Sequence, residues 1–446
     1  MQVLKFGGTS VGSAERMQHV AQLIQGGAPK IVVLSAVSGT TNKLVAIAEA
    51  LKQSNSALAQ TRLEALELEY QTLIQDLLPQ ALLPQANQLL ETRFSEIRAL
   101  FNRPFTLSAE KVILAQGELI STHLFRLYLE SIEVSSALLP ALDFMKIDEN
   151  QEPDFAYIRE RLQLILEAYQ QEAVLITQGY ICRNAHGEVD NLQRGGSDYT
   201  ATLIGAAIQA QEIQIWTDID GLHNNDPRVV KYTTPVRQVS YREAAELAFF
   251  GAKILHPTCV IPAEQQNVPI RLKNTFAPDA VGTLISQQGS GQRLTAIAAK
   301  GGITALKIRS GRMLNAYGFL RKVFEVFEAY RTPIDMITTS EVSVSLTIDQ
   351  DENLPAILRD LRTFGEVSVD EDHTIICIVG DALNEHKGYT KHIFSALEEI
   401  PIRMVSYGGS NNNISILVPS AYKNQALLNL HEQLFTKHVD YQSIED

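Results

Sequence analysis

The sequence predicts an α/β domain, layered around a mainly parallel central sheet, followed by two smaller βαββ modules of ferredoxin-like layout. Short runs of apolar and β-branched residues, such as residues 31–34, are typical of strands buried on both faces of a sheet. They alternate with amphipathic patterns such as residues 14–24, and this alternation is typical of layered α/β domains. Two C-terminal stretches of similar layout, about 70 residues apart, indicate an internal duplication.

The elements of the first domain follow one another in a regular order. A short strand at residues 3–4 enters a glycine turn, the helix 14–24 follows, and the strand 31–34 leads into a helix from about residue 43. Between residues 54 and 101, leucines and aromatic residues recur at steps of three and four, which predicts an inserted helical hairpin packed on the body of the domain. Later elements are predicted as strands at residues 173–176, 213–217 and 268–272 and as a helix at residues 197–209.

The C-terminal part is separated by residues 282–302, which are rich in Gly, Ser and Gln. We therefore expect a first domain over residues 1–290 and two modules over residues 303–370 and 371–446. Each module is predicted as strand, helix, strand, strand. As an alternative, the last strand of the second module could join the first module.

Composition and charge restrict the functions open to this chain. It has 446 residues, with 38 Lys and Arg against 51 Asp and Glu, and a net charge of −13. An acidic chain without a basic block is a poor partner for nucleic acid or for an anionic membrane. No apolar run has a length that spans a bilayer, and no secretory signal is expected. The cysteines Cys182, Cys259 and Cys377 lack disulfide or zinc spacing, which favours a cytoplasmic location and burial as small apolar residues.

The segment 5–10, Lys-Phe-Gly-Gly-Thr-Ser, is the first candidate for chemistry. A Lys at a strand end, followed by paired glycines, lets backbone N–H groups and an ammonium approach phosphate oxygens. The chain has neither the GxxxxGK[ST] loop nor the GxGxxG fingerprint of the common nucleotide-binding motifs. Taken alone, the segment is equally compatible with a tight turn beside a surface Lys.

Two further segments place polar groups at element ends. In residues 193–201, Arg194 could form paired hydrogen bonds with a carboxylate, and Ser197 or Asp198 could cap the helix that follows. The strand 213–217 ends in Thr217-Asp218, at the sheet edge where open α/β folds bind ligands. Each segment alone is also compatible with a surface cap or turn. The same holds for Glu118, which could begin a solvated helix, and for Lys253, which could be a surface Lys.

Taken together and in this order, the motifs resemble those of the aspartate kinases of the amino-acid kinase family. The matching segments are KFGGTSV, RGGSDYTA, WTDIDGL with DPRVV, and FGAKILHP. The resemblance covers essentially the whole chain. The insert and the length are similar to the monofunctional, lysine-sensitive type, and the duplicated tail is similar to a pair of ACT regulatory modules. This implies the amino-acid kinase fold and the phosphorylation of L-aspartate by ATP, the first step of the pathway to lysine, threonine and methionine.

The resemblance also implies roles for single residues. Lys5 and Asp198 would be catalytic. Glu118 would take the ammonium of aspartate, and Arg194 would pair with its α-carboxylate. The full set for aspartate would be Ser35, Thr41, Glu118, Arg194 and Asp198. The set for ATP and its phosphates would be Lys5, Phe6, Gly7, Gly8, Thr217, Asp218, His223, Arg228, Lys253 and Ile254, with His223 at a position where Tyr is common.

The implied mechanism needs no general base. The attacking group would be the side-chain carboxylate of aspartate, which is already ionised at pH 7. Catalysis would consist of positioning and charge neutralisation by Lys5, by glycine N–H groups and by Mg²⁺. The Mg²⁺ would be held by the ATP phosphates and not by protein ligands.

A lysine effector site is implied in the first C-terminal module. Its residues would be Met313, Asn315, Ala316, Phe319, Leu320, Asp335, Thr339, Ser340 and Glu341. An acidic pocket at an interface of ACT modules suits a cationic effector, and we expect a homodimer or a dimer of dimers through these modules. Asn315 and Ala316 replace a His-Ser pair of the enterobacterial type, and the lost hydroxyl would weaken lysine binding.

Two alternatives stay open from the sequence. One is another carboxylate kinase of the same fold, such as an acetylglutamate or glutamate 5-kinase. The other is a catalytically silent amino-acid sensor that uses only the C-terminal modules. The ACT-like tail argues against the first, and the joint presence of Lys5, Arg194, Asp198 and Asp218 argues against the second.

Overall fold

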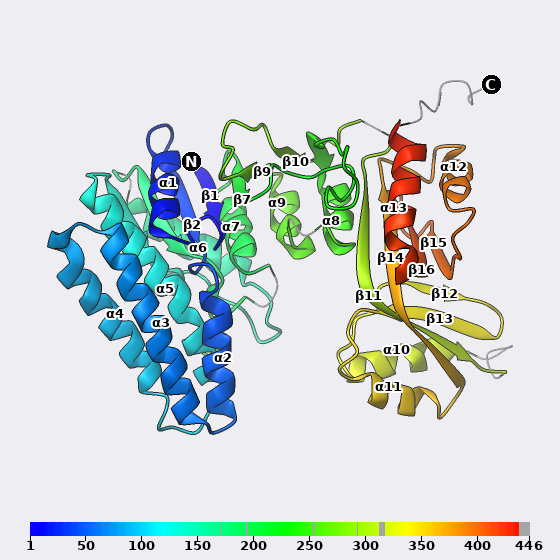
Figure 1. Cartoon of the computed structure of the whole chain (residues 1–446), viewed down its shortest axis with the longest axis horizontal. Coiled ribbons are helices and arrows are strands. Elements are labelled where there is room, and N and C mark those ends of the chain that lie inside the picture. The colour runs from blue at the N-terminus through cyan, green and yellow to red at the C-terminus, as the bar shows by residue number, and fades with distance from the viewer. Residues whose placement is uncertain (170, 193–194, 253–254, 292, 312–316, 437–446) are drawn as a thin grey trace. The chain divides into compact units, whose positions relative to one another are not determined.

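The computed structural model of the chain describes residues 1–446 except 170, 193–194, 253–254, 292, 312–316 and 437–446 (Figure 1). Its internal contacts divide the chain into two compact units. The first comprises Met1–Leu222, Arg237–Tyr241 and Ile254–Gln288, and the second comprises His223–Val236, Arg242–Lys253 and Gly289–Asp446. Two segments that precede residue 289 therefore group, by their contacts, with the C-terminal part of the chain.

The first unit is built on an eight-stranded sheet with the order β3-β4-β2-β1-β7-β9-β10-β8. Neighbouring strands are parallel from β3 to β9, whereas β10 is antiparallel to β9 and parallel to β8. A separate hairpin pairs β5 with β6. The strands are β1 (Gln2–Phe6), β2 (Lys30–Leu34), β3 (Ser136–Leu139), β4 (Val174–Gln178), β5 (Ile181–Arg183), β6 (Val189–Asn191), β7 (Ile213–Thr217), β8 (Gln238–Ser240), β9 (Ile270–Asn274) and β10 (Thr283–Ser286).

Helices cover both faces of this sheet. Leu4 and Phe6 of β1 belong to a core that also contains residues of the first five helices. On the opposite face Ile213 of β7 packs so closely on Gly205 of α7 that a Cβ there would lie 2.3 Å from the Ile side chain. The helices of this unit are α1 (Ala14–Ile24), α2 (Thr40–Lys52), α3 (Ser56–Leu77), α4 (Leu83–Arg98), α5 (Leu107–Ser131), α6 (Phe155–Glu167), α7 (Gly196–Ala207) and α9 (Val260–Gln266). From Arg242 on, the helix α8 (Tyr241–Phe249) belongs to the second unit.

The helical insert is confirmed as the pair α3 and α4, which lie beside α2 and α5 (Figure 1). Tyr70 of α3 and Phe94 of α4 are buried between them, with ring centroids 6.0 Å apart. The predicted helix from about residue 43 begins earlier, at Thr40, because Gly39 takes the left-handed conformation that ends the preceding loop.

The second unit contains one six-stranded antiparallel sheet, with the order β12-β13-β11-β14-β16-β15. It shows the predicted duplication, since strand, helix, strand, strand, helix occurs twice. The first copy is β11 (Ala296–Arg309), α10 (Phe319–Ala329), β12 (Ile337–Thr339), β13 (Ser343–Ile348) and α11 (Leu354–Leu361). The second copy is β14 (Glu366–Val379), α12 (Tyr389–Ala396), β15 (Met404–Tyr407), β16 (Asn413–Pro419) and α13 (Lys423–His431).

The two copies share their long central strands. Ile297, in the first half of β11, joins the core of the second copy, whereas Leu306, in its second half, joins the core of the first. Val367 of β14 packs on the first core and Ile376 lies in the second. The last described strand, β16, pairs with β14 and β15.

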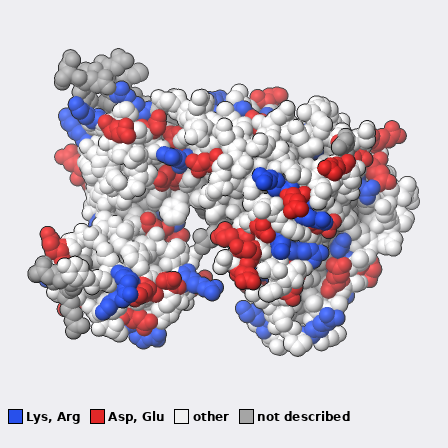
Figure 2. All heavy atoms as spheres, turned by 180° about the vertical axis from the view of Figure 1, so that it is seen from behind, with Lys and Arg blue, Asp and Glu red and all other residues white. Residues whose placement is uncertain are grey.

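The surface carries charges of both signs in small groups, as the view in Figure 2 shows for one face. No helix among the described residues has the length and apolar character needed to cross a membrane. All three cysteines are buried and free, in line with the sequence analysis.

Candidate functional site

Four parallel strands of the first unit end at the same edge of the sheet. Phe6 of β1 lies in register with Leu34 of β2 and Trp216 of β7, and Leu34 lies in register with Gln178 of β4. The segments that follow these strands must therefore leave the sheet side by side. They are the glycine turn 7–8, the loop 35–42, Gly179-Tyr180 and Thr217-Asp218.

A cavity of about 430 Å³ lies at this edge. It contains four of the predicted site residues, Gly8, Ser35, Thr41 and Glu118, and two residues without a predicted ligand role, Tyr180 and Ser197. The remaining lining residues are Thr9, Ala36, Val37, Ser38, Gly39, Asn42 and Gly196.

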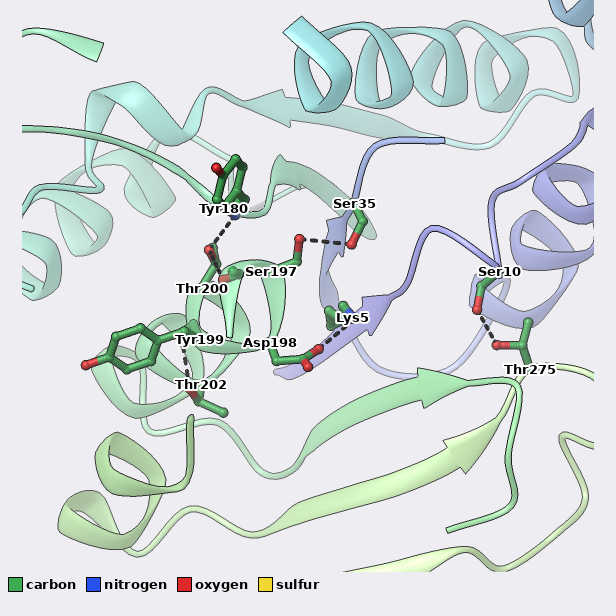
Figure 3. Close-up of polar contacts among 11 residues, drawn as sticks. Lys5, Ser10, Ser35, Tyr180, Ser197, Asp198, Tyr199, Thr200, Thr202 and Thr275 are labelled. Carbon is green, nitrogen blue, oxygen red and sulfur yellow. Dashed lines mark hydrogen bonds and ion pairs between the residues drawn. The ribbon is translucent and has the colours of Figure 1, made fainter. Parts of the chain in front are cut away.

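Lys5 and Asp198 form an ion pair beside the glycine turn (Figure 3). Lys5 Nζ lies 2.6 Å from Asp198 Oδ1, and the two side chains are 10% and 18% exposed. Lys5 is supplied by β1, and Asp198 by the first turn of α7. An ammonium has three protons to donate, so Lys5 can keep this pair and still bind an anion.

The start of α7 approaches the end of β4 very closely. A Cβ on Gly179 would lie 2.3 Å from Cβ of Ser197, so only glycine fits between them. Ser35 Oγ donates a hydrogen bond to Ser197 Oγ at 2.9 Å (Figure 3). The expectation that Ser197 or Asp198 caps the helix is wrong, because the cap is Gly195, with φ of 73° and no side-chain hydrogen bond. Both side chains face the site instead.

Glu118 lies in the middle of α5 and is only 3% exposed. Its Oε1 accepts a hydrogen bond from the Ala36 N–H at 3.2 Å, and its Oε2 has no hydrogen-bond partner within the described residues. Burial raises the pKa of Glu118 to about 8. The alternative that Glu118 begins a solvated helix is wrong. A buried carboxylate oxygen without a donor is costly unless a ligand supplies one.

Close packing brings α5 and the loop 35–42 together. A Cβ on Gly117 would lie 2.8 Å from Ala36 Cβ, so the glycine lets the loop approach the helix turn that carries Glu118. Ser121 of α5 also donates a hydrogen bond from Oγ to the Ser35 carbonyl at 2.8 Å. The loop and the carboxylate therefore form one wall of the cavity.

The glycine turn is also fixed on its other side. Ser10 Oγ lies 2.7 Å from Thr275 Oγ1, in the segment after β9 (Figure 3). Phe6 stacks on Trp216 with ring centroids 5.5 Å apart, which places the residue before Thr217-Asp218 beside the turn. Lys5, Gly7, Thr217 and Asp218 thus come from adjoining strand ends.

Among the described residues, the predicted nucleotide contacts His223 and Arg228 do not line this cavity. His223 and Arg228 belong to the second unit, where Arg228 forms an ion pair with Asp226 at 2.7 Å. Arg194, Lys253 and Ile254 lie outside the described residues. The roles of all five stay predictions.

Of the predicted effector residues that the structure describes, Asp335 is buried and forms an ion pair. Its side chain is 2% exposed, and its Oδ1 lies 2.7 Å from Nζ of Lys300. The same ammonium lies 2.8 Å from Asp349 Oδ2 and over the ring of Phe249, 4.7 Å from its centroid. Phe319 and Leu320 begin α10, and Thr339, Ser340 and Glu341 follow at the end of β12. Met313, Asn315 and Ala316 lie outside the described residues.

The sequence analysis missed Tyr180 as a site residue. Tyr180 lines the cavity, has a positive φ of 68°, and donates a hydrogen bond from its backbone N–H to Thr200 Oγ1 at 2.9 Å. Burial raises the pKa of its phenol to about 12. The available signal was its place directly after a predicted strand that ends at Gly179, on the same edge as Thr217-Asp218.

Comparison with known proteins gives the relationships of the chain. Residues 1–274 match the amino acid kinase family, and residues 376–434 match an ACT domain. The chain is 35% identical over 449 residues to lysine-sensitive aspartokinase 3 of Escherichia coli (strain K12), across 97% of this chain and 99% of that protein. It is 34% identical over 467 residues to the chloroplastic aspartokinase 1 of Arabidopsis thaliana, across 97% of this chain and 80% of that protein.

Solved structures agree with these matches. The crystal structure of E. coli aspartokinase III in complex with aspartate and ADP (R-state) matches with a TM-score of 0.86 and 33% identity, covering 98% of this chain and 100% of that one. The complex of E. coli aspartokinase III with lysine and aspartate (T-state) matches with a TM-score of 0.81 and 34% identity, covering 98% and 99%. The predicted family resemblance is confirmed, and the chain belongs to the amino acid kinase family and, within it, to the aspartokinases with C-terminal ACT modules.

Proposed function

We propose that this chain transfers the γ-phosphoryl group of ATP to the side-chain carboxylate of L-aspartate, giving ADP and 4-phospho-L-aspartate. The observation that carries the proposal is that a buried carboxyl group and an ammonium group lie at one edge of the sheet. A cavity holds the buried Oε2 of Glu118, which has no hydrogen-bond partner in the described part of the chain, and the ammonium of Lys5 lies at the adjoining strand end. A zwitterionic amino acid and a polyphosphate fit these two groups. The match to an aspartokinase in complex with aspartate and ADP supports the same substrates.

Aspartate binding is assigned to the cavity. The Glu118 carboxylate receives the ammonium of aspartate, which gives Oε2 the donor that the described residues do not supply. Ser35 and Thr41 contribute from the loop 35–42, and Asp198 orients the reacting groups through Lys5. Arg194 binds the α-carboxylate with its paired N–H groups.

Phosphate binding is assigned to the glycine turn. Gly7 and Gly8 offer backbone N–H groups, and Lys5 neutralises the charge that develops on the transferring phosphoryl group. Mg²⁺ enters as part of the nucleotide substrate and offsets the charge of its phosphates. The remaining ATP contacts are Phe6, Thr217, Asp218, His223, Arg228, Lys253 and Ile254. The carboxylate of aspartate attacks directly, since it is ionised without a base.

Regulation by lysine is assigned to the first ACT module. The acidic residues Asp335 and Glu341 favour a cationic effector. The structure of an aspartokinase in complex with lysine and aspartate supports this choice. We further propose a homodimer, or a dimer of dimers, through the ACT modules, and a cytoplasmic location.

The test is a coupled assay of ADP release with aspartate, glutamate or acetylglutamate as acceptor, each with and without lysine and threonine. We expect turnover with aspartate alone and cooperative inhibition by lysine. Turnover with glutamate or acetylglutamate in place of aspartate would show another carboxylate kinase. Lysine binding without any turnover would show a silent sensor, and activity that is unchanged by millimolar lysine would refute the regulatory part.

A further inference from the structure

Residues 35–42, here called the substrate loop, comprise the loop 35–39 and the first residues of α2, and they are held by hydrogen bonds from two other helices. Two come from α5. The Ala36 N–H donates to Glu118, and Ser121 donates to the Ser35 carbonyl. Both fix the first residues of the loop. The far end of the loop, where Thr41 lines the cavity, is contacted instead by the helical insert.

Tyr70 supplies this contact from α3. Its hydroxyl lies 3.0 Å from Thr40 Oγ1, and both residues are buried, at 2% and 3% exposure. Its ring packs edge-on against Phe94 of α4. Burial raises the pKa of the Tyr70 phenol, so the hydroxyl keeps its proton throughout the working pH range. A buried hydrogen bond between two neutral hydroxyls, 30 residues apart in sequence, therefore joins the insert to the loop.

The position of Thr40 makes this contact relevant to the cavity. Thr40 begins α2, and the cap residue before it, Gly39, makes no side-chain cap hydrogen bond. The methyl group of Thr40 rests over Gly117, where a Cβ would approach it to 3.3 Å. Thr40 is thus placed between Tyr70 on one side and the helix turn of Glu118 on the other, and the next residue is Thr41.

We propose that Tyr70 is a positioning residue for aspartate, acting through Thr40 on the end of the substrate loop that carries Thr41. The insert then has a part in substrate binding, beyond packing on the body of the unit. This inference rests on the proposed function for its substrate, but the ordering of the loop is a property of the free protein and can be measured without it.

The first experiment compares Tyr70→Phe, Thr40→Val, the double variant and Thr40→Ser. Tyr70→Phe keeps the ring and leaves the Thr40 hydroxyl buried without its partner. We expect KM for aspartate to rise on the order of fivefold, with kcat and KM for ATP within about twofold of wild type. The double variant should be no worse than Thr40→Val, because both changes remove the same hydrogen bond. Thr40→Ser should retain a KM near that of wild type.

The matched control is Tyr241→Phe. Tyr241 is also buried in the first unit, and its hydroxyl donates to the Val268 carbonyl at 2.8 Å. This change should lower the melting temperature as Tyr70→Phe does, yet leave KM for aspartate unchanged. Equal changes of KM in both variants would show a general loss of stability and would overturn the proposal.

The second experiment measures hydrogen exchange of residues 35–42 in the substrate-free protein. Tyr70→Phe should speed exchange at the end of the loop near Thr40 and Thr41, and Tyr241→Phe should not. Unchanged exchange in Tyr70→Phe overturns the inference whatever the enzyme's substrate. Faster exchange in a protein whose wild-type form does not turn over aspartate would instead retain the positioning role and refute the proposed function.

Discussion

Lys5 Nζ lies 2.6 Å from Asp198 Oδ1, and this ion pair joins the end of β1 to the first turn of α7. A strand end and a helix start that are 193 positions apart by their numbering (198 − 5) thus hold one ammonium in place. Because the pair is largely buried, it is weakly screened by salt, and the ammonium is fixed before any phosphate arrives.

Removing this ammonium should abolish turnover. We expect Lys5→Ala to lower kcat by at least about 100-fold, because charge on the transferring phosphoryl group loses its neutralising cation. Steady-state ADP release measures the effect, and circular dichroism checks that the variant is folded. The control is Lys43→Ala, which removes a lysine that is 44% exposed on α2 and paired with Glu69. Near-normal kcat in folded Lys5→Ala would contradict the assignment.

Glu118 should make stability fall as pH rises. Burial raises its pKa in the folded protein to about 8, above the ordinary value of 4.5. The folded state therefore holds a proton that the unfolded state has lost, so this contribution is complete below pH 4.5 and is lost as pH rises through about 8. In Glu118→Gln this dependence should vanish, and the melting temperature at neutral pH should rise. Thermal unfolding between pH 5 and pH 9, without ligand, measures it. Equal pH profiles for both proteins would show that Glu118 does not carry the effect.

The same carboxyl group should couple aspartate binding to pH. An ammonium ligand favours the ionised form of Glu118, so binding should release a proton while pH is below about 8. Aspartate affinity should rise with pH across this range, and Glu118→Gln should bind aspartate weakly at every pH. Isothermal titration calorimetry gives the number of released protons from the difference in binding enthalpy between two buffers that have different ionisation enthalpies. No proton release in the wild-type protein at pH 7 would contradict the role of Glu118.

Gly179 should tolerate no side chain. A Cβ at this position would lie 2.3 Å from Ser197 Cβ, so Gly179→Ala must displace the start of α7, and with it Asp198. We expect a loss of about 1–3 kcal/mol in the free energy of unfolding. Activity should fall by about 100-fold, since small displacements of catalytic groups are costly. Gly409→Ala is the control, because its nearest neighbour would be an ordinary contact at 3.9 Å. Wild-type kcat in Gly179→Ala would show that α7 can adjust.

Lys300 should be essential for the stability of the second unit. Burial alone would lower the pKa of its ammonium, but the hydrogen bonds to Asp335 and Asp349 outweigh this and hold the pKa above the usual value. Burial raises the pKa of Asp335 despite Lys300. Lys300→Met leaves the Asp335 carboxylate buried without its cation, and should cost about 3 kcal/mol at neutral pH.

The pH dependence of this variant gives its distinguishing test. Without Lys300 the pKa of Asp335 should rise further, so stability is lost as pH rises and is partly regained in acid, where Asp335 is protonated. Chemical unfolding at pH 5 and pH 8 measures the difference. Lys307→Met, which removes an exposed lysine from the same strand, should have little effect at either pH. An equal loss at both pH values would point to lost packing and not to the unpaired carboxylate.

The fold class and several of the helices and strands were predictable from the sequence alone. Local patterns suffice for this: the helix at residues 14–24 and the strand at residues 213–217 occur at the predicted bounds, because their apolar periodicity reports which face is buried. The sequence also identified the family, because the motifs at the glycine turn 7–8 and at the start of α7 each consist of consecutive residues.

Which side chains meet depends on the tertiary packing. Glu118 contacts Ala36 across 82 positions, Tyr70 contacts Thr40 across 30, and Lys300 contacts Asp335 across 35. None of these pairs has a local signal, since each depends on how one element packs on another. The raised pKa of Glu118 and the missing side-chain cap of α7 have the same origin. Burial and hydrogen-bond partners depend on how closely other elements approach Gly117 and Gly179. The order of residues along the chain does not give the distances between elements that pack together.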